Sequence, residues 1–301
     1  MSLTISKIFS FSEHDAPVYA LEYFDDESFF SGGGDRIVSA RNTNVNSKAK
    51  GIVNTGSTIY SLKYIADKRI LLAGVAGGGM HVIDLDKKKE IHLLVNHQKG
   101  IYDIKYSSIH KKIITSGGDG RITIWSSENF SCLKTINFCE EKIRAIAIDN
   151  LEKTAAIGCG DGYIRILDVE SMELSSQFKA HEMSVNALCF HPERNALLSG
   201  GKDAHLKMWD SDSFKLIESI PAHNYAIYSI SFSPDNNLFA TGSRDKTIKI
   251  WGSSDFNFLS RIDKDNNEGH LYSVNKTFWM KNALLSASDD KKIIGWSIEE
   301  N

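Results

Sequence analysis

The chain has 301 residues, of which 42% are hydrophobic and 24% are charged, and its formal net charge is −3. This composition is typical of a globular protein and excludes a disordered, collagen-like or coiled-coil chain. The slight acidic excess argues against a general polyanion binder, which needs a strong basic excess, so no nucleic-acid partner is expected. At this length the chain forms either two domains or one large all-β domain.

The beginning of the sequence contains no apolar stretch of the length that a secretory signal needs. No run of 18 apolar residues, as in a membrane-spanning helix, occurs anywhere, so we expect no membrane association and a cytoplasmic protein. The cysteines show no Cys-x-x-Cys spacing and are expected to be reduced, buried thiols without a disulfide or a zinc site. They are Cys132, Cys139, Cys159 and Cys189.

A unit of 42 residues recurs along the chain and ends, in its clearest copies, with tryptophan. The same spacing of 28 residues separates His97 from Trp125 and His181 from Trp209. The tryptophan position recurs at Arg41, Ile83, Trp125, Leu167, Trp209, Trp251 and Trp296. All steps are 42 residues except the last, which is 45 because residues 263–269 form a longer connection. Seven units are therefore present.

Each unit predicts four short β-strands, because apolar residues alternate with small or polar ones. In the fifth unit the first three strands are residues 185–190, 195–200 and 205–209. No segment has a helical period, so almost no helix is expected. The seventh unit ends before its fourth strand. Residues 3–9 resemble the segment before His223 and are predicted to supply that strand.

A four-stranded unit of this length with a terminal tryptophan resembles the blade of a WD-repeat β-propeller. The resemblance covers essentially the whole chain, although the Trp-Asp pair itself occurs once, at Trp209-Asp210. It implies an all-β fold with seven blades of four antiparallel strands, the N-terminal strand closing the last blade. The expected single propeller has blade units of about 13–54, 55–96, 97–138, 139–180, 181–222, 223–265, and 270–301 with 3–9.

Four units carry histidine, a serine or threonine, aspartate and tryptophan at matched positions. Ser-His-Asp catalytic triads use these residue types, but a catalytic nucleophile is unique whereas these sets recur. In the family that the chain resembles, they form a structural hydrogen-bond relay, and we expect that role here. The sets are His97, Thr115, Asp119, Trp125; His181, Ser199, Asp203, Trp209; His223, Thr241, Asp245, Trp251; and His270, Ser286, Asp290, Trp296.

Three units depart from this pattern. The first keeps the histidine, serine and aspartate but has Arg41 in place of tryptophan. The second lacks the relay, and the fourth keeps only Asp161. Blades 2 and 4 are therefore expected to depend on apolar packing, and Asp203→Ala is expected to cost more stability than Asp161→Ala.

Other motifs predict no chemistry. No two of the remaining histidines have metal-ligand spacing, so neither a metal site nor a cofactor is expected. The glycine-rich residues 74–79 precede no predicted helix, which favours a hairpin over a phosphate-binding loop.

The resemblance implies a binding face at the mouth of a central channel, toward which two positions of each blade point. The first position follows the first apolar residue of the inner strand and carries four of the ten tyrosines; the second precedes the relay aspartate. Tyrosine and arginine are enriched at interfaces; the tyrosines suit an apolar or cationic side chain of a partner, and the neighbouring basic side chains suit acidic ones. The expected partner-binding residues are Tyr19, Tyr60, Tyr102, Arg144, Asn186, Tyr228, Lys202, Arg244 and Asp289. Alternatively, the tyrosines pack on one another and fill the channel.

The expected function is a monomeric, non-catalytic scaffold that binds a protein or a peptide. A small-molecule-binding or enzymatic propeller is the alternative, and it would need clustered carboxylates or a metal-ligating set at the mouth. A third alternative is a structural module that assembles through its blade edges.

Overall fold

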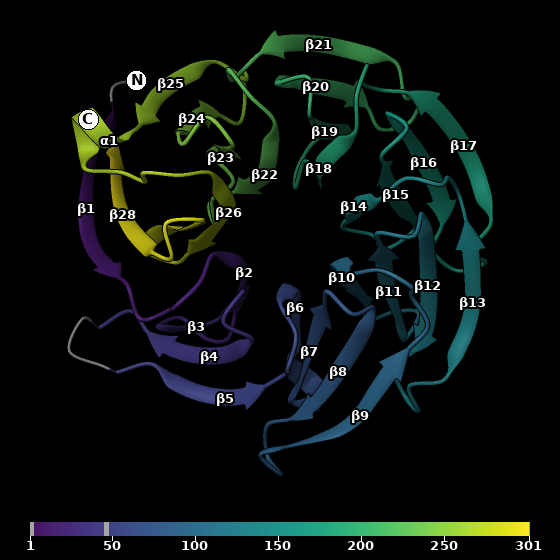
Figure 1. Ribbon diagram of the computed structural model, residues 1–301. Coiled ribbons are helices and arrows are strands. Elements are labelled where there is room, and N and C mark those ends of the chain that lie inside the picture. Colours follow the sequence, from purple (N-terminus) through teal and green to yellow (C-terminus); the bar gives the residue numbers. More distant parts are fainter. Residues whose placement is uncertain (1–2, 45–47, 301) are drawn as a thin grey trace. The chain divides into compact units, whose positions relative to one another are not determined.

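The computed structural model describes residues 3–44 and 48–300. In this part of the chain, 28 β-strands pair into seven antiparallel sheets of four strands each (Figure 1). The predicted fold class, an all-β β-propeller with seven blades, is confirmed. The chain divides into a central unit, Tyr60–Ala222, and a terminal unit, Met1–Ile59 with His223–Asn301.

The central unit contains blades 2 to 5, in each of which four consecutive strands pair in chain order. Blade 2 consists of β6 (Ile59–Ile65), β7 (Ile70–Val75), β8 (Gly79–Asp84) and β9 (Lys89–Val95). Blade 3 consists of β10 (Ile101–Ser107), β11 (Lys112–Gly117), β12 (Arg121–Ser126) and β13 (Cys132–Asn137). Blade 4 consists of β14 (Ile143–Ile148), β15 (Thr154–Cys159), β16 (Tyr163–Asp168) and β17 (Leu174–Lys179). Blade 5 consists of β18 (Val185–Phe190), β19 (Ala196–Gly201), β20 (His205–Asp210) and β21 (Leu216–Pro221).

The terminal unit contains blades 1, 6 and 7. Blade 1 consists of β2 (Val18–Tyr23), β3 (Ser28–Gly33), β4 (Ile37–Asn42) and β5 (Lys50–Asn54). Blade 6 consists of β22 (Ile227–Phe232), β23 (Leu238–Ser243), β24 (Ile248–Gly252) and β25 (Phe258–Ile262). Blade 7 consists of β26 (Val274–Met280), β27 (Ala283–Ser288), β28 (Ile293–Glu300) and β1 (Leu3–Phe11).

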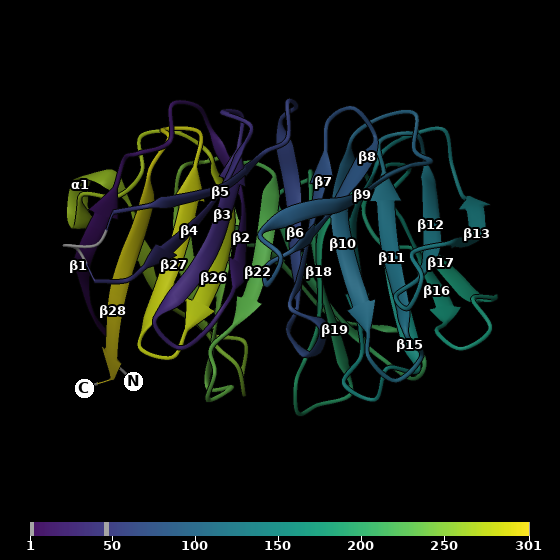
Figure 2. The same ribbon diagram turned by 90° about the horizontal axis from the view of Figure 1, so that it is seen from below.

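The N-terminal strand completes blade 7, as predicted. β1 and β28 lie side by side (Figure 2), and they pair antiparallel from Leu3 opposite Glu300 to Phe11 opposite Ile293. β1 thereby covers the outer edge of β28, which would otherwise expose unpaired backbone groups.

The core of each unit lies between the faces of adjacent blades. The second strand of a blade is almost entirely buried, as in β7 and β19, whereas the fourth strand alternates between exposed and half-buried residues, as in β13. In one apolar cluster, Ile114 and Ile124 of blade 3 pack with Ile146 and Ile157 of blade 4. Burial on both faces explains why the second strands contain hardly any charged residues.

Helical structure is confined to two short segments of the described residues, a 3₁₀ turn at Ala66–Lys68 and α1 (Lys264–Asn267). α1 lies in the longer connection before blade 7, where the Asp263 carboxylate accepts a hydrogen bond from the backbone N–H of Asn266. Among the described residues, no helix has the length and apolarity needed to cross a membrane.

The cysteines differ in exposure. Cys159 is buried and Cys139 and Cys189 are half-buried, but Cys132 is exposed, so the expectation that all four are buried is wrong. Cys132 is the first residue of β13, which is the edge strand of its sheet and is largely exposed.

Candidate functional site

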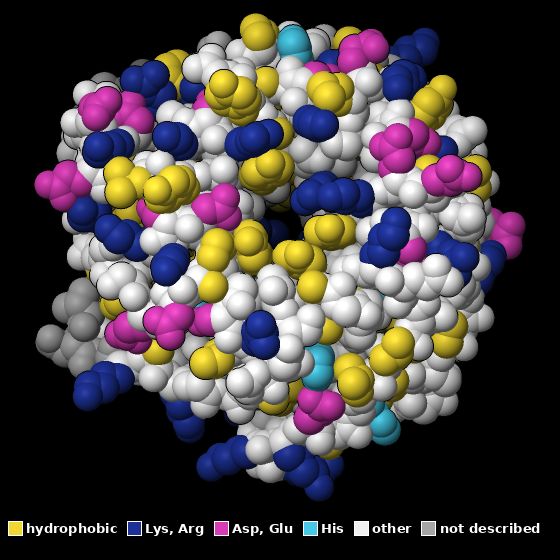
Figure 3. All heavy atoms as spheres, in the orientation of Figure 1, with side chains coloured by type: hydrophobic (Ala, Val, Ile, Leu, Met, Phe, Trp, Pro, Cys, Tyr) yellow, Lys and Arg dark blue, Asp and Glu magenta, His cyan; other side chains and the backbone are white. Residues whose placement is uncertain are grey.

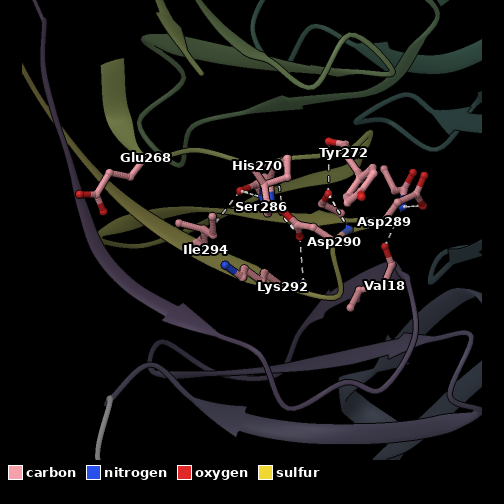
Figure 4. Close-up of polar contacts among 12 residues, drawn as sticks. Val18, Glu268, His270, Tyr272, Ser286, Asp289, Asp290, Lys292 and Ile294 are labelled. Carbon is pink, nitrogen blue, oxygen red and sulfur yellow. Dashed lines mark hydrogen bonds and ion pairs between the residues drawn. The ribbon is translucent and has the colours of Figure 1, made fainter. Parts of the chain in front are cut away.

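The relay residues of blade 7 contact one another in series (Figure 4). The Asp290 carboxylate lies 2.9 Å from His270 Nδ1, and the Ser286 hydroxyl lies 2.8 Å from His270 Nε2. Trp296 Nε1–H donates to the same hydroxyl over 2.9 Å. An ionised carboxylate accepts hydrogen bonds and cannot donate them, so Nδ1 is the donor to Asp290, and in a neutral imidazole Nε2 is then left to accept from the serine hydroxyl.

The other three complete sets repeat this arrangement. Their histidine–aspartate distances are 2.9 or 3.0 Å, and their histidine–hydroxyl distances are 2.8 or 2.9 Å. The tryptophan N–H donates to the hydroxyl over 2.9 to 3.1 Å. Burial alone would raise the pKa of Asp245, but the hydrogen bond and charge interaction with His223 and the hydrogen bonds from Thr247 and Asn224 together lower it.

A hydroxyl, an imidazole and a carboxylate in this order also form the geometry of a catalytic triad. The hydroxyl-bearing residues of all four sets are 0% exposed, and each hydroxyl is occupied by a tryptophan N–H. A substrate therefore has no access to them. Satisfied buried networks of this kind fix strand register, and we assign the four sets that structural role.

Blade 1 keeps part of the relay. His14 lies 2.6 Å from Asp35 and 2.8 Å from the Ser31 hydroxyl. Arg41, at the tryptophan position, is buried, lies 4.0 Å above the Phe11 ring and pairs with a glutamate carboxylate. Its Nη1 has no hydrogen-bond partner among the residues that the structure describes, and burial lowers its pKa.

Blade 4 contains polar groups that the sequence did not predict. Arg165 Nη1 and Nη2 lie 3.2 and 2.7 Å from the two carboxylate oxygens of Asp161. Arg165 comes from β16, the strand after the Asp161 turn, so the two side chains meet across that hairpin. The expectation that blade 4 depends on apolar packing alone is therefore wrong. Blade 2 packs through apolar residues such as Leu72 and Val82, but its buried His81 also lies 2.7 Å from the Glu90 carboxylate, so it does not depend on apolar packing alone either.

A β-bulge lies at the start of the inner strands. In blades 3 and 4 the register shifts between Ile101 and Asp103 and between Ile143 and Ala145, so Tyr102 and Arg144 are the extra residues. Bulges re-aim a side chain away from the regular alternation of a strand. The same shift occurs at four more of the repeat positions singled out from the sequence, namely Tyr19, Asn186, Tyr228 and Asn275.

In the central unit, the bulge residues Tyr102 and Arg144 lie together with a second aromatic and a second basic side chain. The Tyr60 and Tyr102 rings stack with centroids 5.0 Å apart and planes 20° apart. The Arg144 guanidinium lies 4.7 Å from the Tyr102 centroid, and the Lys142 ammonium lies 5.9 Å from it. Figure 3 shows basic side chains beside hydrophobic ones over β10 and β14. We call Tyr60, Tyr102, Lys142 and Arg144 together the tyrosine–arginine surface.

Glycines allow the rings to lie against the neighbouring turns. A Cβ at Gly100 would lie 2.8 Å from the Tyr60 ring, and a Cβ at Gly118 would lie 3.1 Å from the Tyr102 ring. Both tyrosines are half-buried, so they pack on one another and remain partly accessible. Burial and the neighbouring Tyr102 raise the pKa of Tyr60, with Arg144 opposing them.

The remaining predicted site residues differ in their surroundings. In the central unit Lys202 is exposed, whereas Asn186 is buried and accepts a hydrogen bond from Ser184, so a partner cannot reach it. In the terminal unit, Tyr19 and Tyr228 are half-buried.

In blade 7, the predicted binding residue Asp289 makes a contact within the protein. Asn275 Nδ2 donates to Asp289 Oδ1 over 2.8 Å and to the backbone carbonyl of Val18 over 3.0 Å (Figure 4). Asp289 thereby helps to join β26 to β2. Blade 6 differs, because Arg244 is exposed and its guanidinium lies 6.0 Å from the Tyr225 centroid.

A third repeat position also exposes large side chains, and the sequence analysis did not identify it. It lies two residues after the relay histidine and carries Met183, Tyr225 and Tyr272, whose exposures are 43%, 59% and 58%. The repeat register would have revealed this position, but apolar residues at the entrance to a strand are normally attributed to the core.

The family comparison agrees with the fold. A family model described as "WD domain, G-beta repeat" matches residues 5–39, 88–126, 172–210 and 214–252, together just over half of the chain. The second match spans β9 to β12, so the sequence unit joins the outer strand of one blade to three strands of the next. The comparison with curated proteins found no match. With its relay residues, its seven four-stranded blades and these four matches, the chain belongs to the WD-repeat family of β-propellers.

Proposed function

We propose that this protein is a non-catalytic scaffold that binds a protein or peptide through the tyrosine–arginine surface of its central unit. WD-repeat propellers are typically protein-interaction scaffolds and generally lack catalytic activity. The observation that carries the proposal is the contact of Arg144 with Tyr102, which places an accessible cation on a half-buried aromatic ring.

The chemistry of this surface defines the kind of partner. Among the described residues, neither Arg144 nor Lys142 forms an ion pair with a carboxylate. A guanidinium that stacks on a ring keeps its N–H edge for an acceptor, so Arg144 can donate to an acidic side chain of the partner. The stacked tyrosines offer a flat apolar contact beside it. The proposed ligand is therefore a peptide with an acidic residue next to an aromatic or apolar one.

Packing alone is the competing explanation for the tyrosines, because they already contact one another. The enzymatic alternative would need convergent carboxylates or a metal-ligating set. The charged side chains at this surface are cations instead, which favours recognition of an acidic peptide.

Display of a random peptide library against the purified protein tests the proposal. We expect the selected peptides to carry acidic residues beside aromatic ones and to bind more weakly as salt is added. Tyr102→Ala and Arg144→Ala should each weaken binding by about 30-fold, as expected for an interface hot spot of about 2 kcal/mol.

Tyr163→Ala is the matched control, since Tyr163 is also half-buried and lies beside two cations, but on the third strand of blade 4. It should leave binding unchanged. Folding of each variant is checked by circular dichroism. Wild-type affinity in a folded Tyr102→Ala variant would show that the tyrosines serve packing alone.

A further inference from the structure

Blade 4 carries two cysteines where the blades with a complete relay carry other residues. Cys139 occupies the histidine position, and Cys159 lies two residues before the relay aspartate, where these blades have glycine or serine. Their Sγ atoms lie within 4.8 Å of one another. Cys139 lies in the connection from β13 to β14, whereas Cys159 ends β15 and pairs with Ile143.

The backbone around Cys139 is held in place by the neighbouring blade. The N–H groups of Phe138 and Cys139 donate to the carbonyl of Gly120 over 3.0 and 3.4 Å. A Cβ at Gly120 would lie 1.8 Å from the Cys139 carbonyl oxygen, so the two segments are in direct contact. The Cys139 thiol, which donates to the Glu141 carbonyl over 3.2 Å, is therefore held within 4.8 Å of the Cys159 thiol by backbone that is itself fixed.

The two thiols differ in exposure and in the direction in which their pKa is shifted. Cys139 is half-buried, and the hydrogen bond from Cys159, with smaller contributions that include the nearby Arg165, lowers its pKa to about 7. Cys159 is buried, and its hydrogen bond to Cys139 together with burial raises its pKa. An accessible thiolate beside a second thiol is typical of redox-responsive pairs.

Arg165 also argues against the binding of a cation by the two cysteines and the nearby Asp161. A carboxylate oxygen of Asp161 lies within 4.8 Å of both sulfur atoms, but Arg165 donates to both oxygens of that carboxylate. The guanidinium adds positive charge at the same place, which opposes a cation and stabilises a thiolate. We propose that Cys139 and Cys159 form a reversible disulfide when the protein meets a hydroperoxide.

The reaction balances in two steps. The Cys139 thiolate attacks the terminal oxygen of the hydroperoxide, the O–O bond breaks, and Cys139 becomes a sulfenic acid while the alkoxide or hydroxide leaves and takes up a proton. Cys159 sulfur then attacks the Cys139 sulfur, and the hydroxyl leaves as water with the proton of the Cys159 thiol. With hydrogen peroxide, two thiols and one peroxide give one disulfide and two waters.

The test follows each cysteine by mass spectrometry. The reduced protein is treated with hydrogen peroxide at pH 7, free thiols are blocked with N-ethylmaleimide, and the digest is analysed. We expect a linked peptide pair containing Cys139 and Cys159 and lacking two hydrogen atoms, reversed by dithiothreitol. Because the pKa of the Cys139 thiol is lowered, Cys139 should be oxidised about tenfold faster than Cys132, the exposed control.

Variants separate the two steps. In Cys159→Ser, Cys139 should stop at the sulfenic acid, which dimedone traps. In Cys139→Ser, Cys159 should stay reduced. The wild-type result alone can overturn the proposal: Cys139 oxidised no faster than Cys132, or linked to a cysteine other than Cys159, would show that the pair has no redox role.

Discussion

Arg165 donates hydrogen bonds from both terminal guanidinium nitrogens to both carboxylate oxygens of Asp161, over 3.2 and 2.7 Å. In five other blades the equivalent aspartate accepts from a histidine instead. The side chain of Arg165 is 11% exposed, so its charge depends on this partner. Blade 4 has thus replaced one buried polar network with another.

Asp161→Ala should therefore destabilise the protein by about 3 kcal/mol, because it leaves a buried cation unpaired. Asp203→Ala, which removes the carboxylate from an intact relay, should cost about 1–3 kcal/mol. This reverses the order expected from the sequence, and urea denaturation of the two variants measures it. Adding Arg165→Met to Asp161→Ala should recover most of the loss, since both charges are then gone. A loss for Asp161→Ala well below that for Asp203→Ala would show that the ion pair contributes little.

Arg41→Trp should stabilise blade 1. An indole N–H at this position would donate to the Ser31 hydroxyl, which already contacts His14, and would complete the relay found in four other blades. The change also removes a buried cation whose Nη1 has no hydrogen-bond partner within residues 3–44 and 48–300. We expect a gain of about 1 kcal/mol over Arg41→Leu, which removes the cation but donates nothing. Thermal unfolding compares the two, and equal midpoints would contradict the relay assignment.

Stability should fall as the solution is acidified, in two stages. Burial lowers the pKa of His181 below its usual 6.5, despite the opposing contribution of Asp203. As the pH falls below about 6.5, His181 binds a proton in the unfolded chain but not yet in the folded one. Protonation therefore favours the unfolded chain, and stability is lost. The relay aspartates Asp119, Asp203, Asp245 and Asp290 have lowered pKa values, so their contribution is lost below about pH 4.

Calorimetry between pH 7.5 and 3 measures this dependence. His181→Gln should show a smaller decrease between pH 6.5 and 5 than the wild type, because it lacks the first titrating group. A wild-type midpoint that rises between pH 7 and 5 would contradict the assignment.

Gly120→Ala should be strongly destabilising. Gly120 has a φ of +77°, and its Cβ would collide with the Cys139 carbonyl oxygen. The backbone term alone costs about 1 kcal/mol, and the collision adds to it. Gly51→Ala, on outer strand β5 and with its nearest neighbour 3.7 Å from the new Cβ, should change stability by less than about 0.5 kcal/mol. Equal urea midpoints for the two variants would contradict this close approach.

Much of the fold followed from spacing. The period of 42 residues places Trp125, Trp209 and Trp251 at one point of each blade, and the matching histidines and hydroxyls meet there in the structure. The closing strand also followed, because the seventh unit ends one strand short and β1 pairs with β28. These features depend on patterns within one repeat, which a single sequence displays several times over.

The candidate site could be predicted from the sequence only in part. Repeat register predicted that Tyr60, Tyr102 and Arg144 share a position, but the bulges that re-aim Tyr102 and Arg144 have no signature in one sequence. Asn186 has the same position and the same bulge, yet it is buried. The exposure of Tyr225 and Tyr272 likewise depends on how each connection enters its blade.

The sequence by itself determined the strands, their number and the residues of each relay. The alternation of apolar and polar residues and the repeat spacing are both patterns that can be recognised in a single sequence. The tertiary structure decided which side chains meet: Arg165 with Asp161, Arg144 with Tyr102, and Cys139 with Cys159. These contacts join residues 4, 42 and 20 positions apart. They form because hairpins, bulges and the packing of one blade on the next bring distant backbone together, and such geometry is set by the whole fold.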